Sequence, residues 1–142
     1  MFAPVYLDSN AVIRFVESLE QEILALFERA RVEGFRLVTS ELTLAETLVI
    51  PWRRGDRKLT SAYENLLQGN EFLQVVPVDR TILRRSAQLR AEFGGKGMDA
   101  IHCATAMLSG CKIVVSSDRR FRTPPGIVRI DIDAASKWED LI

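Results

Sequence analysis

Four acidic residues lie where an α/β protein could direct them into one crevice: Asp8, Glu46, Asp99 and Asp118. Asp8 follows the apolar segment "VYL", and Asp118 follows "VVSS". Ligand crevices in open α/β sheets lie beyond the carboxyl ends of the strands, so an acid directly after a strand is a candidate for chemistry. Each of these two residues also fits a simpler role, because Asp is common in turns and helix caps.

The other two acids are predicted to lie on helices. Asp99 opens a predicted helix in "GMDAIHCATA", where a carboxylate could also act as a cap at the positive end of the dipole. Glu46 is expected inside an apolar stripe of a helix over residues 41–50. That stripe consists of Leu42, Ala45 and Val49. A carboxylate facing the core is costly unless it binds a metal or is paired, for example with an arginine.

Taken together, the four carboxylates predict a divalent cation. Ionised carboxylates in one small pocket repel one another, which raises their pKa values, and a cation relieves that repulsion. Hard oxygen ligands favour Mg²⁺ or Mn²⁺, which can hold a phosphate oxygen and activate a water molecule. The chemistry expected from such a site is phosphodiester hydrolysis.

Alternating strands and helices are predicted to position these acids. The strands are predicted over residues 5–7, 36–40, 72–78, 112–117 and 126–130. The helices are predicted over residues 10–17, 19–33, 41–50, 56–68, 79–93, 98–110 and 134–141. Pro51 is expected to stop one helix, Pro77 to place its strand at an edge or end it, and Gly110 to follow the C-cap of another. This pattern predicts a three-layer α/β sandwich with a mostly parallel sheet of about four or five strands.

Length and composition limit the classes of protein. The 142 residues contain no linker-like stretch, which favours a single domain over residues 1–142. The 19 basic and 19 acidic residues cancel, so bulk charge does not direct the chain to nucleic acid or to a membrane. No apolar run approaches a membrane span, and the first residues lack the charged flank of a signal peptide, so we expect a cytoplasmic protein. Cys103 and Cys111 are expected to be free, buried thiols.

Three segments carry a resemblance to a known family. "VYLDSNAVI" resembles the opening of a PIN domain, and "TSELTLAETLV" is similar to the second motif of that family. "GMDAIHCATAMLSGCKIVVSSDRRF" resembles its third and fourth motifs together. The resemblance covers almost the whole chain, with the motifs in the right order. It implies a PIN-like fold and a Mg²⁺- or Mn²⁺-dependent endoribonuclease, most similar to the VapC-type toxins of toxin–antitoxin pairs.

The resemblance also implies roles for the acids. Asp8 and Asp99 correspond to the principal metal ligands, with Glu46 and Asp118 assisting directly or through water. Asp79 has no counterpart among the acids of the family, and we assign it to helix capping.

Several neighbours of these acids are candidates for supporting roles. Asn10 is expected to hydrogen-bond Asp8. Ser116 and Ser117 match a hydroxyl position of the family and could orient water or phosphate, although a turn at the end of the strand explains them equally well. His102 lies on the same helix side as Asp99 and could be a ligand, but a hydrogen-bonded histidine beside the site is favoured.

Partners are predicted from basic and apolar residues. Arg119 and Arg120, with Arg122, adjoin Asp118 and could hold RNA phosphates. Six apolar residues are candidates for a surface that binds a partner: Ile13, Phe15, Val16, Val49, Ile50 and Trp52. These side chains are either core, a dimer interface or a groove for a partner helix, and we expect a homodimer that does not bind a membrane. The resemblance implies an antitoxin whose C-terminal segment lies in such a groove.

Three other functions are weighed against the same residues. A phospho-acceptor receiver domain also places Asp and Mg²⁺ at strand ends, but it requires paired acids after the first strand, and "YLDSN" has one. A housekeeping RNA-processing PIN nuclease fits the same acids. A non-catalytic RNA- or protein-binding domain is disfavoured because all four acids are present.

Overall fold

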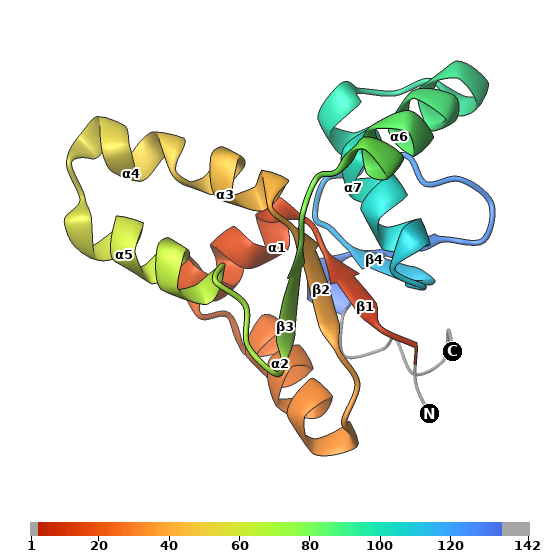
Figure 1. The fold of residues 1–142 in the computed structure, drawn as a ribbon. Coiled ribbons are helices and arrows are strands. Elements are labelled where there is room, and N and C mark those ends of the chain that lie inside the picture. The colour runs from red at the N-terminus through yellow and green to blue at the C-terminus, as the bar shows by residue number, and fades with distance from the viewer. Residues whose placement is uncertain (1–2, 135–142) are drawn as a thin grey trace.

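A five-stranded parallel sheet forms the centre of the fold (Figure 1). The computed structural model describes residues 3–134, so most of the helix predicted over residues 134–141 lies outside the described part. The strands, in spatial order, are β3 (Leu73–Val76), β2 (Leu37–Ser40), β1 (Val5–Leu7), β4 (Ile113–Val115) and β5 (Val128–Ile130). Every neighbouring pair is parallel. The predicted sheet is confirmed, and β3 lies at an edge and ends just before Pro77.

Helices follow the strands. They are α1 (Ser9–Ile13), the π-helix η1 (Arg14–Ser18), α2 (Gln21–Glu33), α3 (Leu42–Thr47), α4 (Val49–Arg54), α5 (Arg57–Leu66), α6 (Arg80–Phe93) and α7 (Gly97–Leu108). Asp79 caps α6, as predicted, because its Oδ1 accepts the Ile82 N–H at 2.9 Å. Gly110 has a φ of +78° just beyond the end of α7, which is the backbone conformation expected after a helix C-cap.

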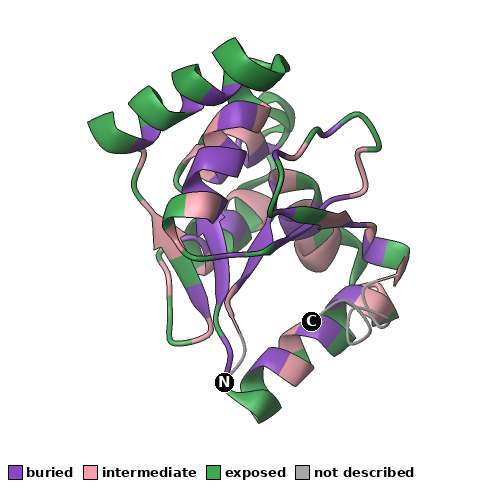
Figure 2. Cartoon of the chain, turned by 90° about the vertical axis from the view of Figure 1, so that its right-hand side faces the viewer, coloured by how far each residue is buried: buried purple, intermediate pink, exposed green. Residues whose placement is uncertain are grey.

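Two apolar clusters cover the two faces of the sheet and make the three layers. Side chains alternate across β1, so that Val5 and Leu7 pack in one cluster and Tyr6 in the other. The first cluster includes residues of α1, α2 and α5, whereas the second includes residues of α6 and α7. Figure 2 shows burial concentrated in the strands and on the inner sides of the helices.

The prediction of one helix over residues 41–50 is wrong in two respects: where the helix ends and which of its side chains are buried. This segment is divided into α3 and α4, and Pro51 is the third residue of α4. Proline is tolerated there because the first N–H groups of a helix have no intrahelical partner. The buried side chains of α3 are Thr43 and Thr47, while Ala45 and Val49 are exposed.

The predicted apolar surface divides into two parts. Ile13, Phe15 and Val16 pack against the core, and the Phe15 ring stacks on Phe27 with centroids 3.9 Å apart. The other three apolar candidates, Val49, Ile50 and Trp52, are 45%, 54% and 64% exposed and form an apolar surface of α4. Within residues 3–134, no helix has the length and apolar character needed to cross a bilayer.

Candidate functional site

The strand order places the ends of β1 and β4 side by side. The chain builds β2 and β3 on one side of β1 and then crosses to build β4 and β5 on the other side. Ligand crevices of parallel sheets form where the strand order reverses in this way. Leu7 pairs with Val115, and the Asp8 N–H donates to the Val115 carbonyl at 3.3 Å. Asp8 and the residues after β4 therefore meet at this switch point.

Asp8 is buried there with only 4% of its surface exposed. Its carboxylate caps α1 by accepting the Ala11 N–H at 3.0 Å, and it is also hydrogen-bonded by the Ser116 side chain. Burial raises the pKa of Asp8, and the hydrogen bonds from Ser116 and Ala11 only partly oppose that effect. Capping and a functional role are thus compatible at this residue. Among the described residues, no hydrogen bond joins exposed Asn10 to Asp8, so its supporting role stays a prediction.

His102 connects β1 to Glu46 through two short hydrogen bonds. Its Nε2 lies 2.6 Å from Glu46 Oε1, and its Nδ1 lies 2.5 Å from the Tyr6 hydroxyl. A carboxylate accepts hydrogen bonds, so Nε2 donates to Glu46. The second hydrogen bond joins Nδ1 to the Tyr6 hydroxyl. Burial, followed by the charge of Asp8, holds the pKa of Tyr6 well above its usual value, which keeps that hydroxyl protonated. His102 is therefore the hydrogen-bonded histidine that the sequence favours.

Glu46 lies on α3, and threonine hydroxyls fix the start of that helix against the sheet. Thr39 Oγ1 donates to the Leu7 carbonyl at 2.8 Å and lies 2.8 Å from Thr43 Oγ1. The Glu46 side chain is 22% exposed, and its hydrogen-bond partner is His102 rather than an arginine. The polar partner expected for Glu46 is present, but the stripe used to place it was wrong.

The charge of Asp118 acts on Asp99. Burial and then the charge of Asp118 raise the pKa of Asp99. Asp118 Oδ1 accepts the Arg120 N–H at 2.9 Å and lies 3.5 Å from Arg120 Nε, and these contacts lower the pKa of Asp118. Glu46 and His102 also act on the charge of Asp99. The charge of Glu46 also raises the pKa of Asp8, so the four predicted acids belong to one electrostatic group.

Ser116 joins two of these acids. It is fully buried, and its side chain bonds the Asp8 carboxylate and accepts the Asp118 N–H at 3.1 Å. Arg129 Nη1 donates to the Ser116 carbonyl at 2.7 Å and so fixes the same turn from β5. Ser116 thereby positions Asp8 and Asp118, whereas the role of half-buried Ser117 stays a prediction.

Two residues at this site were not predicted from the sequence. Tyr6 precedes Asp8 by two positions on β1, so a strand period of two would have placed both on one face. The period-two pattern thus offered a usable signal. Arg129 gave no comparable signal, because its contact depends on the long-range pairing of β4 with β5.

The oxygen donors at this site fit a hard divalent cation. As the side chains stand, no three His, Cys, Asp or Glu residues of the described part converge into a complete metal site. Mg²⁺ does not require such a site, because it keeps several waters and commonly takes one or two carboxylates. Asp8 and half-buried Asp99 are two carboxylates of this site that could hold such a cation.

The family of the chain follows from comparison with known proteins. A family model described as "PIN domain" matches residues 5–126. The chain therefore belongs to the PIN-domain family. No curated protein sequence matches the chain.

Solved structures of toxin–antitoxin proteins share the fold. VapBC2 from Rickettsia felis, bound to a promoter DNA fragment, has a TM-score of 0.75 at 13% identity, covering 90% of this chain and 98% of its own. DNA-bound VapBC from Salmonella typhimurium has a TM-score of 0.67 at 23% identity, with coverages of 92% and 99%. VapC20 from Mycobacterium tuberculosis, a sarcin-ricin loop cleaving toxin, has a TM-score of 0.64 at 15% identity, with coverages of 82% and 92%. These are similarities of fold.

The buried charge of Asp8 predicts a stability effect. The folded-state pKa of Asp8 lies above its ordinary value of 3.8, so between these two pH values the folded chain holds more protons than the unfolded chain. Stability contributed by Asp8 therefore falls as pH rises through that window and stays lost at neutral pH. Because Asn also caps helices, Asp8→Asn should unfold at higher urea concentration than the wild type at pH 7 in EDTA.

The matched control is Asp79→Asn, which makes the same change at an exposed helix cap. Its urea midpoint should stay at the wild-type value. A lower midpoint for Asp8→Asn than for wild type at pH 7 would contradict the assigned cost of the buried charge.

Proposed function

We propose that this PIN-domain protein is a Mg²⁺- or Mn²⁺-dependent endoribonuclease and the toxin of a type II toxin–antitoxin pair. The observation that supports the activity is the buried Asp8 carboxylate, which shares one edge of the sheet with Glu46, Asp99 and Asp118. A costly group of acids at a ligand-binding edge suits a cation-dependent reaction better than a structural role.

In this proposal Asp8 and Asp99 hold the cation, with Glu46 and Asp118 supporting it directly or through water. When bound, the cation would polarise a phosphate oxygen and lower the pKa of a water molecule. Ser116 orients Asp8, and His102 orients Glu46. Exposed Arg119 and Arg120 hold RNA phosphates beside Asp118. The buried thiols of Cys103 and Cys111 do not suit nucleophilic attack, because burial raises both pKa values to about 12.

The antitoxin is proposed to bind the apolar surface of α4. Val49, Ile50 and Trp52 are exposed there, and an arginine of the antitoxin could enter the acidic site. Several proteins with this fold were solved as toxin–antitoxin complexes, which supports a partner of this kind. We further propose that the protein acts in the cytoplasm as a homodimer.

Cation dependence is tested on purified protein. Cleavage of RNA should require Mg²⁺ or Mn²⁺ and stop in EDTA. Asp8→Asn and Asp99→Asn should each lower the rate by about two orders of magnitude or more, because they keep the side-chain shape and remove ligand charge. Asp79→Asn serves as the control and should cleave at the parental rate. Undiminished cleavage in excess EDTA, or parental activity in folded Asp99→Asn, would overturn the proposal.

Toxicity is tested in cells. Expression of the wild-type chain alone should arrest growth, Asp8→Asn should relieve the arrest, and the product of an adjacent small gene should co-purify and suppress cleavage. Harmless expression of an active nuclease that purifies alone would favour the housekeeping RNA-processing function. Absence of cleavage together with RNA or protein binding would favour the non-catalytic domain.

A further inference from the structure

A cavity of about 350 Å³ opens beside Asp99, between the α6–α7 pair and the loop that follows β4. Its size is near the lower end for small-molecule sites, which suits one small ligand group rather than a large ligand. Asp99 lines the cavity, so a group bound there is adjacent to the proposed metal centre.

The inner lining of the cavity is mainly apolar. Leu89 and Phe93 contribute from α6, Ala100 and Cys103 from α7, and Pro124 from the loop. Phe93 is 39% exposed, so part of its ring is accessible. Cys103 Sγ donates to the Arg122 carbonyl at 3.3 Å, which attaches the loop to α7 and fixes that side of the cavity.

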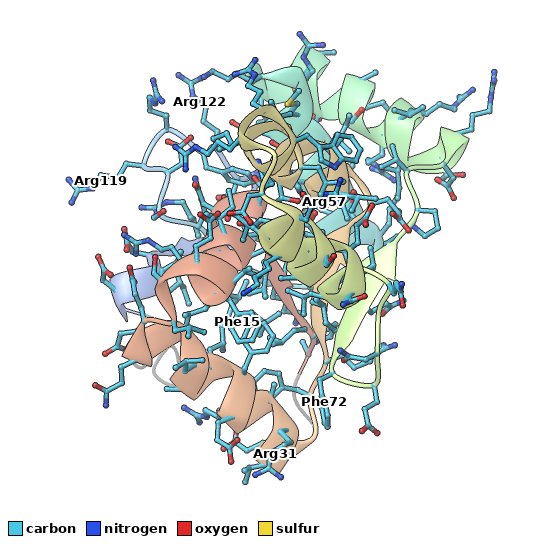
Figure 3. The ribbon with its side chains drawn as sticks, turned by 90° about the vertical axis from the view of Figure 1, so that its left-hand side faces the viewer. Phe15, Arg31, Arg57, Phe72, Arg119 and Arg122 are labelled. Carbon is cyan, nitrogen blue, oxygen red and sulfur yellow. The ribbon has the colours of Figure 1, made fainter. Side chains whose placement is uncertain are left out.

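The rim of the cavity is basic. Exposed Lys96, Arg120 and Arg122 all line it, and a side-chain carbon at Gly94 would lie 3.9 Å from Arg122 Nη1. Arg122 therefore lies close to the α6–α7 turn. Figure 3 shows Arg119 and Arg122 on the loop after β4, with Arg119 extending outward. Basic side chains therefore line the rim of a cavity with a mainly apolar interior, and the cavity lies next to the acidic site.

We propose that this cavity binds one unstacked nucleobase of single-stranded RNA, next to the bond to be cleaved. The inference rests on the proposed function for its substrate class. Single-stranded bases splay out and stack on aromatic side chains, while Lys and Arg hold the phosphates. The accessible ring of Phe93 supplies a stacking surface, and Lys96, Arg120 and Arg122 supply the complementary charge.

The proposal makes this cavity a determinant of where RNA is cut. A paired base cannot enter a cavity of this size while it remains stacked in a duplex, so cleavage should fall in loops or single strands. The base in the cavity would position the neighbouring phosphate against the acids. Phe93 is then a positioning residue for the substrate, separate from the residues that hold the cation.

The test measures RNA binding without cleavage. Wild-type protein in EDTA is titrated against two fluorescein-labelled probes of about ten nucleotides, one a random-sequence oligoribonucleotide and the other an abasic ribose-phosphate chain of equal length. The wild type should prefer the base-bearing probe. Phe93→Ala should bind the base-bearing probe about five- to tenfold more weakly than the wild type does. Its affinity for the abasic probe should be unchanged, because only the stacking interaction is lost.

Two further variants make the result interpretable. Phe93→Trp should keep the preference, because it retains an aromatic face. Leu83→Ala, at a 47% exposed apolar position of α6 outside the cavity lining, should bind both probes as the wild type does. Equal binding of the two probes by the wild type would overturn the inference. Unchanged RNA affinity in folded Phe93→Ala would also overturn it and would assign the cavity to another occupant, such as a partner polypeptide.

Failure of this inference differs from failure of the proposed function. Cation-dependent cleavage without a preference for bases would leave the nuclease standing and remove the base site. A base preference in EDTA without any cleavage in Mg²⁺ or Mn²⁺ would leave the base site standing and remove the nuclease.

Discussion

The buried carboxylate of Asp8 is the constraint around which the site is arranged. Desolvation penalises its charge, and the hydrogen bonds from Ser116 and Ala11 offset only part of that penalty. The parallel sheet places this group where the strand order reverses, so that the chain after β4 brings Ser116 next to it, and Ser116 also accepts the Asp118 N–H. A cation bound there would compensate the buried charge.

Residues on neighbouring elements hold the other acids in place around the end of β1. Tyr6, on β1, orients His102, and His102 in turn fixes the Glu46 carboxylate. Arg120 instead stabilises the charge of Asp118 at the more open side of the site. The acids thus differ in environment, since burial raises the pKa values of Asp8 and Asp99 while hydrogen bonding lowers that of Asp118.

The sequence was sufficient to predict the class of fold and to place Asp8 and Asp118 just after β1 and β4. Acids directly after apolar strands could be placed because parallel strands end at the same side of a sheet. The stripe on α3 was wrong because Thr43 is buried with its hydroxyl bonded to Thr39, and such satisfied polar groups look like surface positions in a sequence. Contacts such as Arg129 with Ser116 depend on strand order, which local patterns do not determine.

The central claim is that Asp8 and its neighbours form a site for a divalent cation, and direct Mn²⁺ binding tests it most simply. Free Mn²⁺ is followed by electron paramagnetic resonance during titration with EDTA-stripped, dialysed wild type, Asp8→Asn and the exposed-cap control Asp79→Asn. The wild type and the control should bind Mn²⁺ equally, and Asp8→Asn should bind it at least about tenfold more weakly. Equal Mn²⁺ affinity in wild type and folded Asp8→Asn would contradict the account.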